Sequence, residues 1–454
     1  MVNQNAVIVG GGVCGLVSSL LLKKRGYNVV LIEQAECIGG LFCSIKDSKG
    51  AAYDMGSHIP NATGVEELDQ ILFGHVDGKS QWNTIDKLES GNYFAGSWDL
   101  SSPFPNAQKL EPAVYSQGCG ELINLTHQPS EQFIYDHCIN SLGVVFTHSI
   151  VVPILQKLYG KLTDIRGLTM EAGLFGFTRI LALPADVAAQ LKELPAFDSK
   201  LGYQTEQDFL ARKERDKLPD VKYFYPNNGE GIGHWVQELL VQVEKAGVEV
   251  ITSERVKKIV RSGTKITHIE LASDRVLSCD LLFWSAPPFI ALNALGIEPQ
   301  RGQMELRTAV IFHLNFDKPL TNQKSHYLWV WDSSTDIFRL TLYPNLDKSV
   351  SHNHLSAEIL CSPDDVSSYS LEDVVAQLKA MSIVDESAQV ISSQTQVINN
   401  TFPVPTKEFK DVNLHNFELL DKSVDNLIVS GRYSGKCWRQ ADVLIDAYNS
   451  INEL

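Results

Sequence analysis

Residues 6–33 read AVIVGGGVCGLVSSLLLKKRGYNVVLIE, a strand pattern followed by a glycine-rich turn, a helix pattern and a second strand. The apolar run Ala6–Val9 predicts a buried strand, and the spacing G-x-G-x-x-G follows it directly. The helix pattern from Leu16 to Lys24 stops before Gly26, which is typical of a helix C-cap. With the strand Asn28–Ile32, this order predicts the β-α-β unit of a dinucleotide-binding Rossmann domain.

Each part of this unit has a physical task. Gly10 permits the tight turn, Gly12 lets the backbone approach a pyrophosphate, and Gly15 lets helix and strand pack closely. The helix N-terminus offers free N–H groups and a positive dipole end to phosphates. Glu33 can accept hydrogen bonds from ribose hydroxyls, and its charge disfavours the 2′-phosphate of NADP. We expect cofactor contacts from Gly10, Gly12, Val13, Cys14, Gly15 and Glu33.

A second glycine turn, Ile38-Gly39-Gly40-Leu41, is followed by the segment 52–58, AYDMGSH. Here the sequence resembles the amine oxidase, protoporphyrinogen oxidase and UDP-galactopyranose mutase superfamily of flavoproteins. The resemblance implies non-covalently bound FAD. It also implies that residues of both segments contact the cofactor: Gly39, Gly40, Leu41, Gly56, Ser57 and His58.

The resemblance recurs further along the chain. Residues 225–233, YPNNGEGIG, precede a helix pattern over Trp235–Ala246 and a strand over Val248–Ile251, as in the family. Another strand, 280–284, stops at the prolines that follow it. A last strand, 426–430, leads into a Gly-Arg pair and a terminal helix pattern. By resemblance, the cofactor contacts from these parts are Val256, Gly431, Arg432, Asp442 and Val443.

Alternating apolar residues begin at Thr308 and predict antiparallel strands there, at 326–331 and at 337–343. The Phe338-Arg339 pair resembles a strand on the substrate side of the flavin in the family.

The predicted fold is α/β, with a Rossmann-type FAD-binding domain and a discontinuous α+β substrate domain of antiparallel sheet plus helices. We expect the FAD-binding domain over residues 1–75, 222–290 and 415–454. We expect the substrate domain over 76–221, mainly helical, and over 291–414, which supplies the antiparallel sheet.

Three functions are compatible with these motifs. The first is an FAD-dependent oxidoreductase that transfers a hydride from a small substrate to flavin. The second is a non-redox enzyme like UDP-galactopyranose mutase, in which reduced flavin attacks a sugar. The Gly-Arg and Phe-Arg pairs favour that relative, whereas the poorly matching residues 74–218 argue against it. The third is a flavin-binding protein without catalysis.

Candidate substrate contacts follow from charged and aromatic residues in apolar surroundings. A buried arginine needs an anion or a structural partner, so Arg179 and Arg339 suggest an anionic, nucleotide-sugar-like substrate or structural salt bridges. The residues considered are Arg179, Tyr225, Tyr327, Arg339 and Tyr343. No pair of residues predicts a general base, so the catalytic residues stay unassigned.

Composition limits the partners. The 454 residues are 44% hydrophobic and 20% charged, as in ordinary globular proteins, and the formal net charge is −15. That charge argues against nucleic-acid binding. No apolar run is long enough for a membrane span, and no signal peptide precedes the first strand, so we expect a cytoplasmic protein. No ligand spacing predicts a metal site, and no motif predicts an oligomeric state.

Overall fold

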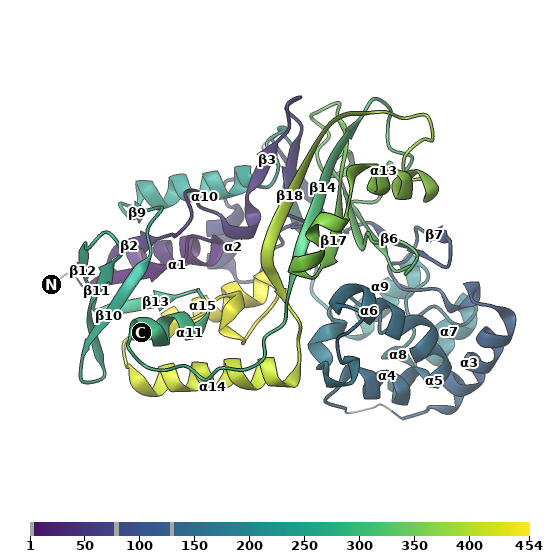
Figure 1. The fold of residues 1–454 in the computed structure, drawn as a ribbon, viewed down its shortest axis with the longest axis horizontal. Helices are drawn as coiled ribbons and strands as arrows, with labels where there is room; N and C mark the ends of the chain where they lie inside the picture. Colours follow the sequence, from purple (N-terminus) through teal and green to yellow (C-terminus); the bar gives the residue numbers. More distant parts are fainter. Residues whose placement is uncertain (1–3, 77–80, 128–130) are drawn as a thin grey trace.

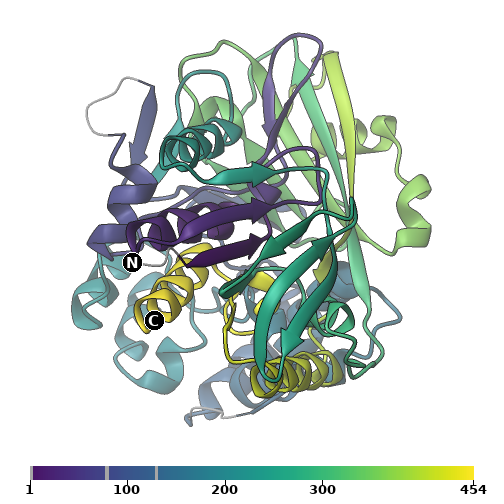
Figure 2. The same cartoon turned by 90° about the vertical axis from the view of Figure 1, so that its left-hand side faces the viewer.

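The protein is described here by a computed structural model that covers residues 4–76, 81–127 and 131–454. Figure 1 shows two β-sheets side by side, with a group of helices beneath the second one. Segments from the beginning, middle and end of the chain are interleaved in the first sheet, as the colours of Figure 2 make visible. The fold is therefore α/β with a Rossmann-type unit, as predicted from the sequence.

The first sheet has five parallel strands in the order β19-β13-β1-β2-β9. Their apolar residues face helices on one side and a second layer on the other, so they are buried on both faces. Only two of the five strands belong to the β-α-β unit that contains the glycine turn, and the other three come from distant parts of the sequence. The strands are β1 (Asn5–Val9), β2 (Asn28–Ile32), β9 (Glu249–Ile251), β13 (Leu281–Trp284) and β19 (Leu427–Val429).

Different layers cover the two faces of this sheet. Helices lie on one face: α1 (Val13–Lys24), α2 (Glu66–Phe73), α10 (Gly233–Lys245) and α15 (Gln440–Asn452). The other face carries a small antiparallel sheet and two helices: β10 (Val256–Ser262), β11 (Lys265–Leu271), β12 (Val276–Ser278), α11 (Pro288–Ala294) and α14 (Lys407–Ser423). The predicted strands and helices of this part are confirmed to within a few residues.

The second sheet has seven strands in the order β18-β14-β17-β16-β15-β6-β7. The predicted antiparallel strands are β14 (Leu306–Phe316), β15 (Tyr327–Val330) and β16 (Arg339–Leu342). The sequence did not predict where they sit: β17 (Asn353–Cys361) separates β14 from β16, and β18 (Val390–Pro403) forms the edge. Helix α13 (Leu371–Ala380) packs on one face of this sheet.

The opposite face packs on a lobe of helices: α3 (Pro112–Asn124), α4 (Ile134–Leu142), α5 (Val144–Phe146), α6 (Val152–Tyr159), α7 (Ala185–Leu191), α8 (Pro195–Asp198) and α9 (Glu206–Arg215). The expectation of a mainly helical segment over 76–221 omitted three strands: β5 (Trp82–Ile85), β6 (Ser90–Phe94) and β7 (Ser97–Asp99). They are too short to show a clear period of two. Over the described ranges, no helix has the length and apolar character needed to cross a membrane. The division of the chain into these five domain segments stays a prediction.

One buried carboxylate forms hydrogen bonds with several segments next to the first sheet. Asp54, at the end of β4 (Ala52–Asp54), is 1% exposed and accepts hydrogen bonds from three donors. The donors are the hydroxyl of Tyr225 at 2.6 Å, the hydroxyl of Ser44 at 2.7 Å and the backbone N–H of Ile232 at 2.9 Å. Burial raises the pKa of Asp54 to about 6, although all three donors favour the charged form.

We predict a pH signature for this group. The pKa of Asp54 is higher in the folded chain than its usual 3.8, so its contribution to stability is full below about pH 4 and falls as the pH rises through 6. Asp54→Asn removes this titration. The free energy of unfolding of the native protein, relative to the variant, should fall by about 3 kcal/mol between pH 4 and pH 7. Urea unfolding at both pH values measures it, and a constant difference would contradict the shift.

Candidate functional site

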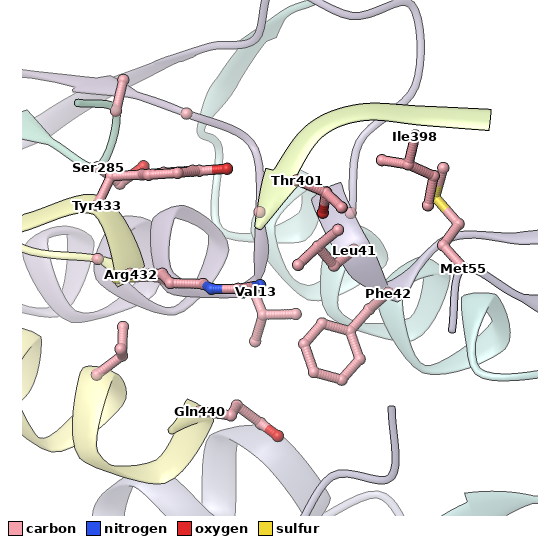
Figure 3. Close-up of a pocket in the computed structure, with 18 of the residues that line it drawn as sticks. Val13, Leu41, Phe42, Met55, Ser285, Ile398, Thr401, Arg432, Tyr433 and Gln440 are labelled. Atoms are coloured by element: carbon pink, nitrogen blue, oxygen red, sulfur yellow. The ribbon is translucent and has the colours of Figure 1, made fainter. Parts of the chain in front are cut away.

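A cavity of about 1250 Å³ lies between the Rossmann unit and the seven-stranded sheet. Its wall begins at the glycine turn after β1, continues along the 39–42 and 55–59 segments, and ends at β14, β18 and the residues before α15. Figure 3 shows side chains from these distant segments around one space, among them Leu41, Met55, Thr401 and Arg432. The fold thus brings the separated cofactor motifs of the sequence to one place.

The glycine turn leaves open space directly beside its backbone, where a bound group could approach closely. A Cβ built on Gly12 meets no atom within 4 Å, so the space beside this residue is open to the cavity. A Cβ on Gly15 would lie 1.9 Å from the carbonyl oxygen of Gly10, and this fixes Gly15 as the close packing point of α1. Helix α1 directs its free N–H groups to the same space. The turn therefore fits a pyrophosphate.

Glu33 follows β2 and lines the cavity at its far end. Its carboxylate accepts hydrogen bonds from the backbone N–H of Gly11 at 2.7 Å and of Ala35 at 2.8 Å. These two contacts hold the side chain at the mouth of the turn, where a ribose would meet it. The contact of Glu33 with a ribose stays a prediction.

Most residues predicted to contact the cofactor line this cavity: Gly10, Gly12, Val13, Cys14, Glu33, Gly39, Gly40, Leu41, Ser57, His58, Val256, Gly431, Arg432 and Val443. Three others do not. Gly15 lies beneath the turn, and Gly56 lies over Glu358, whose Oε2 would be 3.0 Å from an added Cβ. Asp442 is exposed in the first turn of α15. Their contacts with a cofactor stay predictions.

Arg432 carries a charge without an acidic partner. Its guanidinium lies over the ring of Trp438 at 3.7 Å and over that of Phe402 at 5.6 Å. No carboxylate of the described residues is within ion-pair distance of it, and burial lowers its pKa to about 10. A guanidinium held against two neighbouring rings in a partly buried wall is well suited to meet an anionic group such as a phosphate.

Arg339 has a different environment. It forms a bidentate ion pair with Glu358 of β17, with Nε–Oε1 at 2.7 Å and Nη2–Oε2 at 2.6 Å. Glu358 also accepts the backbone N–H of Ser57 at 3.2 Å and is 3% exposed. The nearby His58 has its pKa lowered to about 3, first by burial and then by the charges of Arg339 and Arg432. His58 is therefore neutral at physiological pH.

The other residues proposed for the substrate lie elsewhere. Arg179 donates to the carbonyl oxygens of Asp198 and Leu201 in the helical lobe and does not line the cavity. Tyr225 and Tyr343 are buried in the Asp54 network, where Tyr343 accepts the N–H of Asp54 at 2.9 Å. Tyr327 is also outside the cavity wall. Arg339 thus has a salt-bridge partner, as considered from the sequence, whereas Arg179 bonds backbone carbonyl oxygens and forms no ion pair with a described residue.

Sequence reasoning missed the aromatic end of the cavity. Phe175, Phe338, Phe402 and Trp438 line it, and we call this group the aromatic chamber. Phe402 lies 5.4 Å from Phe175 and 5.4 Å from Trp438 between ring centroids. Its members come from a lobe loop, the segment before β16, β18 and the segment before α15. No local pattern connects them.

We predict that Gly12→Val empties the site without unfolding the protein. The backbone of Gly12 is extended, with φ −72°, so valine fits it, and its side chain would occupy the open space that a pyrophosphate needs. Bound nucleotide, measured after denaturation, should be lost while the melting temperature stays near that of the unloaded native protein. Gly15→Ala is the matched control and should disrupt folding, because its Cβ would collide with Gly10. Normal nucleotide content in Gly12→Val would contradict the assignment.

We also predict that Arg339→Leu is strongly destabilising, by about 3 kcal/mol or more, since it leaves the carboxylate of Glu358 buried without its cation. The double variant Arg339→Leu/Glu358→Gln should recover most of this loss, because glutamine still accepts the N–H of Ser57. Chemical unfolding of the native chain, both single variants and the double variant measures the coupling. An unchanged stability in Arg339→Leu would instead favour a free arginine that serves a ligand.

Comparison with known proteins gives matches along the chain. Residues 8–71 match the family model described as an NAD(P)-binding Rossmann-like domain. The 1-hydroxycarotenoid 3,4-desaturase of Flavobacterium sp. (strain P99-3) is 23% identical over 59% of this chain and 53% of its own length. The flavin-containing amine oxidase B of Homo sapiens is 26% identical over 22% of this chain and 24% of its own length. The matches thus span about half of the desaturase and a quarter of the amine oxidase.

The fold has a full-length counterpart among solved structures. Reduced UDP-galactopyranose mutase aligns with 100% of this chain and 94% of its own, with a TM-score of 0.77 and 16% identity. At that identity the likeness concerns the fold. The sequence matches, the shared fold and the order of the cofactor motifs all support the resemblance of this chain to the amine oxidase, protoporphyrinogen oxidase and UDP-galactopyranose mutase superfamily of flavoproteins.

Proposed function

We propose that the chain is an FAD-dependent oxidoreductase that acts on a substrate held in the aromatic chamber. The observation that carries the proposal is the continuity of one cavity from the glycine turn to that chamber. A nucleotide bound at one end and a substrate at the other would share a single enclosed space. Pockets of this kind, at the interface between two parts of a fold, are the usual place of cofactor chemistry.

Several features support FAD as the nucleotide. The superfamily members are flavin-dependent, and the open space at Gly12 fits a pyrophosphate. The carboxylate of Glu33 suits a free ribose and disfavours a phosphorylated one. We propose a non-covalent FAD.

The protein's own groups would orient the reactants and exclude water. Bound FAD supplies a hydride acceptor. The rings of the chamber shield the space above it, and His58 stays neutral and adds no charge. The Arg339–Glu358 pair fixes the 56–58 segment, because Glu358 binds the backbone N–H of Ser57.

The chamber favours a substrate with a substantial apolar body. Its wall carries four aromatic rings together with aliphatic residues such as Ile311 and Leu360. Glu358 neutralises the charge of Arg339, which removes the main support for a nucleotide-sugar-like substrate. One relative is named a carotenoid desaturase, and hydride removal from a C–H bond of an apolar molecule fits this chamber. We therefore propose an apolar, planar or extended substrate.

We predict that the purified protein is yellow and releases FAD on acid denaturation. Mixed anaerobically with a panel of apolar polyenes, amines, alcohols and nucleotide sugars, it should be bleached by the apolar compounds in preference to the others. The loss of the visible absorbance of oxidised flavin follows this reaction. Phe402→Ala should weaken the bleaching while leaving flavin content intact, because the ring lines the chamber at its substrate end.

Other outcomes would separate the alternatives. Turnover of a nucleotide sugar only after dithionite reduction, without net redox change, would replace the oxidoreductase by a mutase-like enzyme. A colourless protein that does not take up FAD would overturn the cofactor proposal itself.

A further inference from the structure

Strand β18 is an edge strand without the usual protection. It is 14 residues long and pairs with β14 alone. Figure 1 shows it beside β14, on the side nearer the first sheet. Apart from that ladder, no backbone group of residues 391–402 makes a hydrogen bond within the described parts of the chain. A long row of free N–H and C=O groups is a template for another strand.

The composition of β18 distinguishes it from the rest of the chain. Residues 390–403 read VISSQTQVINNTFP and contain no charged residue, although 20% of all residues are charged. Natural edge strands usually carry lysine, other charges or an early proline that discourage pairing. Here the single proline is the last residue of the strand. Two large apolar side chains are also exposed, Ile391 by 46% and Val397 by 42%.

A bulge limits the free edge to one regular stretch. The register with β14 shifts between Ile398 and Phe402, and Asn400 has φ 53°, in the left-handed region. Residues 392–398 pair regularly with β14, from Ser392 opposite Asn315 to Ile398 opposite Ala309. The centre of this stretch is Thr395, which is exposed.

We infer that β18 is the interface of a two-fold symmetric dimer in which residues 392–398 pair antiparallel with the same residues of a second copy of this chain. An antiparallel pair of identical strands is self-complementary, as an isologous interface requires. A net charge of −15 per chain makes two copies repel one another, so the contact is best placed on an uncharged stretch. The seven-stranded sheets would join into one continuous sheet, with Thr395 opposite its counterpart.

The interface would border the cavity, because Ile398, Thr401 and Phe402 of the same strand line it. The inference itself rests on the strand and its surroundings alone, and it holds whether or not the proposed reaction is the right one.

Sedimentation velocity of the purified, cofactor-loaded protein tests the inference. The native chain should sediment with twice the mass of one chain. Thr395→Lys should reduce it to one chain, because two like charges would face each other across the pair. Val276→Lys is the matched control: it adds the same charge at a residue that is 58% exposed on β12, an edge strand of another sheet, and should remain dimeric.

A mixing experiment fixes the register. Thr395→Glu alone should also be monomeric, and an equal mixture of Thr395→Glu and Thr395→Lys should restore the dimer. Melting temperatures and bound-cofactor content verify that each variant is folded. A native protein that sediments as one chain at every concentration, a folded Thr395→Lys variant that dimerises as well as the native chain, or a mixture that stays monomeric would each overturn the inference.

Discussion

The carboxylate of Asp54 joins three parts of the chain that are distant in sequence. It receives hydrogen bonds from Ser44, Tyr225 and the N–H of Ile232, and the last of these begins the turn into α10. From the N–H of Asp54 the contacts continue to Tyr343, Ser356 and His313, which lie in or next to the seven-stranded sheet. Because the cavity is enclosed by both sheets, its shape depends on this buried chain of polar contacts.

A buried series of polar contacts is stable only when each polar group has a hydrogen-bond partner. Tyr343 and Ser356 are buried, and their hydroxyls are 2.8 Å apart. His313 contacts Ser356 at 2.7 Å through Nδ1 and Gln396 of β18 at 3.3 Å through Nε2, and burial lowers its pKa to about 4. A neutral imidazole that donates through one nitrogen and accepts through the other links the two strands without a buried charge.

The sequence predicted the Rossmann unit well because its signals are local. The glycine turn, its helix and Glu33 are neighbours in the chain, and each has a physical role that fixes the residue type. The aromatic chamber could not be predicted, since Phe175 and Phe402 belong to distant segments that only the fold brings together. The partner of Arg339 escaped prediction for the same reason: Glu358 lies on a strand that the sequence did not single out. The sequence indicated that Arg339 is partly buried, but it did not indicate that Glu358 is the carboxylate that pairs with it.

The order of strands in the first sheet has a consequence for biosynthesis. A ribosome releases the glycine turn before β13 and β19, yet β1 pairs with β13, which in turn pairs with β19. Helix α1 packs against α2, α10 and α15, so part of its apolar face stays uncovered until α15 has been made. Contacts so distant in sequence form slowly, because the entropy of closing a long loop is lost before the contacts can stabilise the fold. Until α15 has been made, the β-α-β unit that contains the glycine turn therefore keeps part of its apolar surface exposed, and transiently exposed apolar surface of this kind favours aggregation during synthesis.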